Sequence, residues 1–377
     1  MIHSRTLREL IAFEDLVPHP LERSETIPAH WYSSPDIFQL EREAIFSRSW
    51  QLVGLSSRVK NPGEQILAEL AGEPIIVVRG KDDKLRAFFN VCRHRGGPLA
   101  TEDGCLKVLQ CQYHGWTYAL DGSLRGVPDF DRVELFDKKD FGLKEVSCIE
   151  RDGMVFVSIE CPLLPADQLL DGVVERIANV DLSTLRFHSR VRYAVECNWK
   201  MYVDNYLEGY HVPIVHPELF RLYDFNAYTT ETREYYSFQV SPLAETEQLY
   251  SGQLREGMKR EALYYWIWPN LMLNLLPGRL QTNVVCPIDA RHCEVIFDYY
   301  YEDCDSAHAQ SMIAEDLAFS DRVQQEDIEI CERVQRGVES RSYDRGRFSA
   351  KRENAVHHFQ SLLKQAYQTA LITPPAV

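Results

Sequence analysis

Between residues 50 and 158 the chain alternates short hydrophobic runs with polar turns, a pattern typical of β-strands that bury one face. The clearest runs lie at residues 51–53, 65–67, 74–78, 87–91 and 153–158. A further run leads into Asp121-Gly122, a dipeptide that favours a tight hairpin turn. The pattern therefore predicts a small all-β domain, which we place at residues 45–160.

After residue 160, hydrophobic residues recur at both helical and strand spacing, which predicts a larger mixed domain over residues 161–377. We expect a strand at 187–196, a helix at 198–208, further strands between 235 and 301, and helices at 306–335 and 353–371. These elements favour a curved antiparallel sheet around a long helix, an arrangement of the helix-grip type. The predicted fold class is therefore α+β.

The N-terminal residues 1–44 are rich in proline and show little periodicity, so they predict an arm with short helices that packs on the larger domain. The first fourteen residues are charged and lack the apolar stretch of a signal peptide. No later apolar run is long enough to span a bilayer. We therefore expect a cytoplasmic protein.

The composition is that of an ordinary globular protein, with 45% hydrophobic and 26% charged residues in a chain of 377. The formal net charge of −15 argues against nucleic acid or an anionic membrane as a partner. Ten cysteines in a chain of this length do not indicate a disulfide scaffold.

Two cysteines and two histidines lie close together inside the β-rich part of the chain. Cys92 and His94 form a Cys-x-His pair, and after sixteen intervening residues Cys111 and His114 form a Cys-x-x-His pair. In a Rieske centre, two thiolates hold one iron of a [2Fe–2S] cluster and two imidazoles hold the other. A structural zinc site usually has its first two ligands two to four residues apart, so Cys-x-His is unusual for it. The spacing favours a Rieske cluster over a zinc site or four unrelated residues.

A second group of candidate ligands begins with His211 and His216, which are five residues apart. On an ideal helix this spacing would place the two side chains off a common face, but Gly209 and Pro213 interrupt the helix. Both imidazoles can then approach one point. Two histidines and one carboxylate that leave coordination positions open are typical of non-heme iron(II) oxygenases. The carboxylate must come from elsewhere in the chain.

Asp327 is the best candidate for that carboxylate, because it lies on the apolar stripe of the predicted helix at 306–335. Its helical neighbours are Val323, Ile330, Cys331 and Val334. A carboxylate that faces a core is costly unless it is paired or bound to a cation. Glu326 has charged neighbours and is interpreted as solvated. A salt-bridged buried acid is the alternative for Asp327, and structural roles are the alternative for the two histidines.

The chain resembles a known family in three segments. Residues 92–96 (Cys-Arg-His-Arg-Gly) and 111–116 (Cys-Gln-Tyr-His-Gly-Trp) are similar to the Rieske signature of the Rieske non-heme iron oxygenases, in their catalytic (alpha) subunit. Residues 204–216 resemble the mononuclear iron motif of that family, and residues 326–332 resemble the segment that supplies its aspartate ligand. The resemblance covers nearly the whole chain from residue 50 onward.

This resemblance implies a terminal oxygenase with two metal cofactors, a Rieske [2Fe–2S] cluster and mononuclear Fe(II). The cluster ligands would be Cys92, His94, Cys111 and His114, and the iron ligands His211, His216 and Asp327. Asn205 and Glu208 would be catalytic residues, with Glu208 bridging the iron site to the Rieske histidine of a neighbouring subunit in a homotrimer. Electrons would come from an NAD(P)H-dependent flavin/iron–sulfur reductase or a ferredoxin. The cosubstrates would be O2 and a small molecule.

Glu208 departs from the pattern of many ring-hydroxylating members, which carry aspartate one residue further from the asparagine. Glutamate at the shorter spacing is more similar to choline monooxygenase and the carnitine and glycine-betaine oxygenases. The resemblance therefore favours an N-methyl or quaternary amine as the substrate. Hydroxylation of an aromatic ring or side chain is the alternative, and a Rieske-type electron-transfer protein is a remote one.

Several aromatic residues near the second motif are candidates to line a substrate cavity: Tyr206, Tyr210, Phe220, Tyr223, Phe225, Trp266 and Trp268. Aromatic faces bind quaternary ammonium groups by cation–π attraction. The same side chains could line a pocket for a flat ring, or pack in the core. The sequence motifs therefore indicate the mechanism specifically, but they give only weak information about the substrate.

Overall fold

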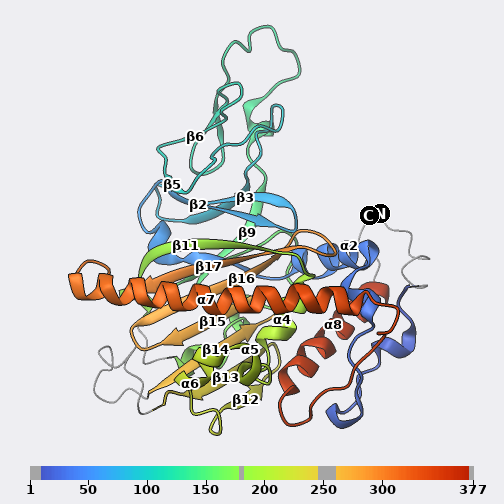
Figure 1. Cartoon of the computed structure of the whole chain (residues 1–377). Helices are drawn as coiled ribbons and strands as arrows, with labels where there is room; N and C mark the ends of the chain where they lie inside the picture. Colours follow the sequence, from blue (N-terminus) through green and yellow to red (C-terminus); the bar gives the residue numbers. More distant parts are fainter. Residues whose placement is uncertain (1–9, 178–181, 245–259, 373–377) are drawn as a thin grey trace. The chain divides into compact units, whose positions relative to one another are not determined.

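The computed structural model describes residues 10–177, 182–244 and 260–372 (Figure 1). The chain forms two compact units, one from Phe46 to Ser183 and one that combines Met1–Ile45 with Thr184–Val377. The first unit extends beyond residue 160, where the sequence analysis places the boundary. The reason is that the following segment packs back on this unit: the indole N–H of Trp50 donates to the carbonyl oxygen of Leu164 (3.1 Å).

The unit Phe46–Ser183 is built from two antiparallel sheets, as the alternating pattern predicts. The larger sheet has the strand order β1 (Gln51–Leu55), β10 (Met154–Ser158), β9 (Glu145–Arg151), β4 (Leu85–Phe89), β3 (Glu73–Arg79), β2 (Glu64–Leu70) and β5 (Gly104–Cys105). The smaller sheet contains β6 (Leu109–Gln110), β7 (Thr117–Tyr118) and β8 (Leu124–Gly126). Short helices lie at Phe46–Arg48, Ser56–Val59, Lys138–Phe141, Ala166–Gln168 and α3 (Val173–Arg176).

The predicted hairpin at Asp121-Gly122 connects β7 to β8. Gly122 has φ +82°, and a Cβ atom there would lie 2.5 Å from the ring of Phe88. Only glycine satisfies both the left-handed backbone and the close approach of the buried ring. Asp121 Oδ1 accepts from the backbone N–H of Ser123 (2.9 Å), which closes the turn.

The second unit contains a seven-stranded antiparallel sheet and two long helices. The strand order is β11 (Arg186–Val195), β17 (Cys293–Tyr301), β16 (Arg279–Pro287), β15 (Leu271–Leu276), β14 (Glu261–Ile267), β13 (Tyr236–Pro242) and β12 (Thr229–Thr232). The long helix α7 (Ala307–Val338) runs across one face of this sheet (Figure 1). Further helices are α4 (Trp199–Tyr206), α5 (Val212–Val215), α6 (Pro217–Leu222) and α8 (Asn354–Ile372), and a 3-10 turn at Leu182–Thr184 spans the boundary between the two units. This confirms the predicted α+β fold with a curved antiparallel sheet and a long helix.

The N-terminal arm belongs to this second unit and contains α2 (Pro35–Ala44) and 3-10 helices at Phe13–Leu16, Leu21–Arg23 and Ala29–Tyr32. Glu41 of α2 pairs with Lys200 of α4 (2.6 Å), and both side chains are fully buried. Glu41 also accepts from the indole N–H of Trp199 (2.8 Å) and from the hydroxyl of Tyr367. Because every charge in this group has partners, it fixes the start of α4 rather than destabilising the core. Helix α4 in turn leads to the candidate site.

None of the helices within the described ranges is long and apolar enough to span a bilayer.

Candidate metal centres and substrate cavity

The four predicted cluster ligands lie on two loops of the first unit, one after β4 and one after β6. The thiols of Cys92 and Cys111 are buried, and the rings of His94 and His114 lie 4.7 Å apart. The Nδ1 atoms of both histidines are buried and have no hydrogen-bond partner within the described residues. Buried nitrogens without a partner are costly. Two thiols and two such nitrogens on facing loops therefore fit a [2Fe–2S] cluster as ligands.

The two loops share one backbone design. The N–H of Gly96 donates to the carbonyl oxygen of Cys92, and that of Gly115 to the carbonyl oxygen of Cys111, both at 3.0 Å. Both glycines have positive φ, +74° and +72°. A Cβ atom on Gly97 would lie 2.8 Å from the Cys111 sulfur, so glycine there lets the two loops approach each other. The glycines beside the four predicted ligands are thus required by this geometry.

Two residues beside the loops were not predicted to take part in the site. The Tyr118 hydroxyl lies 3.3 Å from the Cys92 sulfur, and the Trp116 ring stacks on His94 at 4.9 Å. Burial, and after it the hydrogen bond to Cys92, raises the pKa of Tyr118, so its hydroxyl stays protonated. A hydroxyl that donates to a cluster sulfur tunes the reduction potential. The only sequence signal for Tyr118 is its position directly after the Cys-x-x-His loop.

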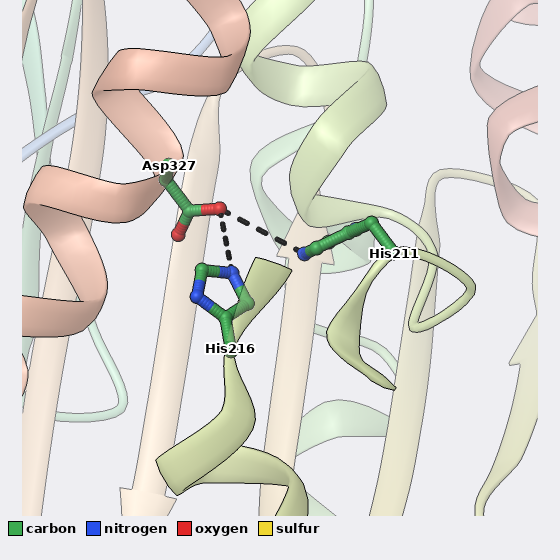
Figure 2. A group of neighbouring side chains, drawn as sticks. All are labelled: His211, His216 and Asp327. Carbon is green, nitrogen blue, oxygen red and sulfur yellow. Dashed lines mark hydrogen bonds and ion pairs between the residues drawn. The ribbon is translucent and has the colours of Figure 1, made fainter. Parts of the chain in front are cut away.

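The three predicted iron ligands meet in the second unit. His211 precedes α5 and His216 lies between α5 and α6, while Asp327 comes from α7 (Figure 2). The Nε2 atom of His216 lies 3.0 Å from Asp327 Oδ1, and that of His211 lies 3.7 Å from the same oxygen. One ligand atom from each residue lies within 4.8 Å of the others. The short α5, with Pro213 in its first turn, separates the two histidines as the broken-helix argument requires.

A second carboxylate holds the far side of each imidazole. His211 Nδ1 donates to Glu208 (2.6 Å), and His216 Nδ1 donates to Glu326 (2.7 Å). Both Nε2 atoms are then left to face Asp327. Metal-ligating histidines usually donate their other ring N–H to a carboxylate in this way. Glu326 is partly solvated, with 39% of its side chain exposed, but its carboxylate also reaches His216, a contact that the sequence analysis did not predict.

Asn205 lies on the face of α4 that meets α7. Its side-chain N–H donates to Asp327 Oδ1 (2.6 Å), which positions that carboxylate. Helix α4 is held in this register by its N-cap residue Asn198, whose side-chain N–H donates to the carbonyl oxygen of Ala290 (2.8 Å). Asn205 therefore supports the site through Asp327.

The electrostatics of this group suit a cation. Burial lowers the pKa of His216, but the hydrogen bonds and charges of Asp327 and Glu326 outweigh burial and raise it. The site thus stabilises positive charge although His216 is buried. Two imidazoles and a carboxylate, in surroundings that favour positive charge, fit a divalent iron, which prefers such mixed nitrogen and oxygen ligands.

We expect Glu326→Ala to weaken iron binding at this site by about ten- to a hundredfold, because His216 would lose the group that orients it. The affinity can be measured by titrating iron against a competing chelator. Glu329→Ala is the matched control, since Glu329 lies on the same helix but is exposed and pairs with Arg333. An unchanged iron affinity in Glu326→Ala would contradict the proposed role of this carboxylate.

A cavity opens beside the three ligands. Its aromatic lining consists of Tyr202, Tyr206, Tyr223, Phe225, Tyr228, Tyr264, Phe297 and Phe319. The predicted Tyr206, Tyr223 and Phe225 are among these residues. The other predicted aromatics are not: Tyr210 and Phe220 are exposed, Trp266 is buried in the core, and Trp268 packs against Phe359. Tyr264, Phe297 and Phe319 were missed because only the strand register and the helix position decide which way they point.

Comparison with known proteins agrees with this geometry. Residues 49–137 match the Rieske [2Fe-2S] domain, and residues 182–369 match the ring hydroxylating alpha subunit (catalytic domain). The chain is 36% identical over 361 residues to the chloroplastic choline monooxygenase of Arabidopsis thaliana, covering 91% of this chain and 83% of the relative. It is 31% identical over 367 residues to the carnitine monooxygenase oxygenase subunit of Escherichia coli K12, covering 94% and 97%.

Solved structures give the same picture. The quaternary ammonium Rieske monooxygenase CntA in complex with L-carnitine superposes with a TM-score of 0.83 at 30% identity, covering 93% of this chain and all of that one. Naphthalene 1,2-dioxygenase with indole bound has a TM-score of 0.75 at 22% identity, which shows the shared fold alone.

The two domains and the site define an oxygenase that combines a Rieske cluster with non-heme iron. This chain belongs to the Rieske non-heme iron oxygenases, as a catalytic (alpha) subunit. The predicted family, enzyme class and [2Fe–2S] cofactor are thereby confirmed. An electron-transfer protein is not supported, because residues 182–369 match a catalytic domain. As an oxygenase subunit it uses O2 and depends on a separate reductase.

Proposed function

We propose that this oxygenase oxidises an N-methyl or quaternary amine beside an iron held by His211, His216 and Asp327. The observation that carries the proposal is the aromatic lining of the cavity next to these ligands. Aromatic faces attract alkylammonium cations, and they do so more strongly when water is excluded. The acidic residues among the described lining residues are Glu208 and Asp327, both at the iron site. The rings would therefore hold the cation, and the ligands would face the group to be oxidised.

The roles of the remaining residues follow from their contacts. Cys92, His94, Cys111 and His114 would hold the cluster, which would supply electrons, and the iron at this site would supply oxygen activation. Asn205 holds Asp327 in place, and Glu208 holds His211. The chain fixes the geometry into which substrate and O2 enter.

Glu208 is proposed to have a further role between subunits. Its side chain is only 12% exposed, and it contacts His211 through the nitrogen that does not face Asp327. Such a carboxylate would connect the iron site to the Rieske histidine of a neighbouring subunit in a homotrimer, which stays a prediction. The domain assignment 1–44, 45–160 and 161–377, the flavin/iron–sulfur nature of the reductase and a cytoplasmic location stay predictions.

Hydroxylation of an aromatic ring or side chain is the second candidate, because the same lining rings could stack on a flat substrate. The two candidates differ in the charge of the ligand. A cation cage favours a trimethylammonium group over a neutral tert-butyl group of the same shape, whereas an apolar slot does not.

We therefore expect choline to bind at least about tenfold more tightly than 3,3-dimethyl-1-butanol, its neutral isostere. Binding is measured by calorimetry on the iron-loaded protein without oxygen, with benzoate as the aromatic ligand. Binding of benzoate together with equal affinities for the two isosteres would move the protein to the second candidate.

Tyr264 offers a matched pair of variants for this measurement. Its ring lines the cavity, and its hydroxyl forms a hydrogen bond with that of Tyr223. Tyr264→Phe keeps the aromatic face and should keep the preference for the cation. Tyr264→Leu removes the face and should reduce the preference several-fold, at about 0.5–2 kcal/mol for one ring. Equal behaviour of the two variants would show that this ring does not contact the cation.

A further inference from the structure

Three buried cysteines lie beside the start of helix α4, and none of them lines the cavity or belongs to a predicted metal site. Cys197 connects β11 to α4, Cys293 begins β17, and Cys331 lies on α7. All three are free thiols, and each residue is at most 2% exposed. They come from elements that are far apart in the sequence, so the fold brings their sulfur atoms together.

Hydrogen bonds on both sides of Cys197 fix its position against α7. The backbone N–H of Glu196 donates to the side chain of Glu332 (3.1 Å), and that of Asn198 donates to another side chain of the same helix (3.0 Å). Glu332 directly follows Cys331 in the helix. The backbone around Cys197 is therefore held beside Cys331.

The sheet fixes Cys197 on its other side, against Cys293. Strands β11 and β17 are antiparallel neighbours, and their register places Val195 opposite Cys293. Cys197 follows two residues after Val195, so it lies diagonally across the strand pair from Cys293. Side chains in diagonal positions of a strand pair are within reach of each other.

The three sulfur atoms form a hydrogen-bonded group with Cys197 at its centre. Hydrogen bonds from Cys293 and Cys331 lower the pKa of Cys197, although burial acts in the opposite direction. The hydrogen bond to Cys197, and after it burial, raises the pKa of Cys293 and likewise that of Cys331, so both stay protonated. The backbone N–H of Tyr202 also donates to Cys197. Cys197 is thus the thiol with the greatest thiolate character in the group, and the thiolate is the nucleophilic form of cysteine.

The group lies close behind the wall of the cavity. Tyr202, whose backbone contacts Cys197, itself lines the cavity, and its hydroxyl donates to Gln324 of α7 (2.6 Å). A small oxidant in the cavity is therefore separated from the sulfur atoms by one residue, and local opening of the chain admits small molecules to such sites. Larger thiol reagents are excluded.

We propose that Cys197 and Cys293 form a site of thiol oxidation, at which hydrogen peroxide converts the pair into a disulfide with Cys197 as the attacking sulfur. Hydrogen peroxide is the two-electron reduction product of the O2 that this enzyme uses. The proposal adds a modification site to the oxygenase and does not depend on which substrate the cavity binds.

The reaction balances in two steps. The Cys197 thiolate attacks one peroxide oxygen and breaks the O–O bond, which gives a sulfenic acid and hydroxide; the hydroxide takes up the proton that Cys197 had lost. The Cys293 sulfur then attacks the Cys197 sulfur and breaks the S–O bond, and the oxygen leaves as water with the Cys293 proton. Two electrons pass from the two sulfur atoms to the peroxide, and two water molecules are released.

The test follows every cysteine of the holoenzyme during exposure to a small excess of hydrogen peroxide. The remaining thiols are blocked with iodoacetamide in denaturant, and peptides from a digest without reductant are identified by mass spectrometry. We expect the peptides of Cys197 and Cys293 to be joined, and dithiothreitol to separate them. The exposed Cys105 and Cys161 should be oxidised at least about tenfold more slowly, because their thiols lack the hydrogen bonds that favour a thiolate at Cys197.

Simple packing of the three thiols predicts the opposite order, since buried structural cysteines are inert. Oxidation of Cys105 and Cys161 while Cys197 and Cys293 stay reduced would overturn the inference. A link from Cys197 to Cys331, or oxidation of Cys197 without any link, would overturn the assignment of Cys293 as its partner.

Two variants, each checked for an intact cluster spectrum, assign the link to this pair. Cys293→Ala should abolish the link and leave Cys197 as a sulfenic acid that dimedone labels. Cys304→Ala is the matched control, because Cys304 lies in the same tryptic peptide as Cys293 but beyond the other end of β17, and it should keep the link. A link that persists in Cys293→Ala, or is lost in Cys304→Ala, would show that Cys293 is not the partner.

Discussion

We expect Asp327→Ala to abolish product formation and to remove the mononuclear iron, while the Rieske cluster stays in place. Asp327 supplies the one carboxylate toward which both Nε2 atoms point, and Asn205 donates to the same oxygen. Loss of a partner around a ligand already costs ten- to a hundredfold in metal affinity. Loss of the ligand itself should lower affinity by at least about a hundredfold, so iron would be lost during purification.

The measurement is the iron and acid-labile sulfide content per chain, together with the visible spectrum of the cluster. Wild-type protein should hold three irons and two sulfides per chain, as one [2Fe–2S] cluster and one further iron require. The variant should hold two of each, and Glu329→Ala, on the exposed face of the same helix, should match the wild type. A variant that keeps its third iron and its turnover would show that Asp327 is a salt-bridged structural acid.

Glu208→Gln should also reduce turnover strongly, but without the loss of iron expected for Asp327→Ala. Glutamine keeps an oxygen that can accept from His211 Nδ1, so iron should stay bound. It removes the negative charge that we propose connects this site to the cluster of a neighbouring subunit. We expect steady-state turnover to fall by at least about a hundredfold, or about 2.7 kcal/mol in the barrier, with both metal centres occupied.

The control is Glu218→Gln, because Glu218 is an exposed residue of α6 that pairs with Arg322. It should leave turnover unchanged when reductase and substrate are supplied. Near-normal coupled turnover of Glu208→Gln would mean that Glu208 only orients His211, and would end its proposed role between subunits.

The proposed ligand residues could be brought forward from the sequence because their chemistry is local. Cys92, His94, Cys111 and His114 lie within 23 residues, and the glycines beside them mark the turns. Asp327 is distant from the histidines, but its place on the apolar stripe of a long helix identified it. Spacing and periodicity thus indicate both proposed metal sites.

The supporting residues were not predictable because they depend on contacts across the fold. Glu326 contacts His216, which is 110 positions away in the sequence. Arg279 of β16 likewise forms an ion pair with Asp316 of α7. The first compact unit extends to Ser183 because the segment after residue 160 packs back on the sheet, which proline signals alone could not show. Strand register likewise decided which aromatic residues line the cavity.

A single-turnover experiment on reconstituted, chemically reduced protein tests the central claim most directly, since it needs no reductase. The protein is mixed with O2 and with choline, glycine betaine, carnitine and benzoate together, and all products are followed by mass spectrometry. The account predicts an aldehyde derived from one of the amines, in an amount comparable to the bound mononuclear iron, and unchanged benzoate. Hydroxylated benzoate with all three amines intact would contradict the account and assign the protein to aromatic hydroxylation.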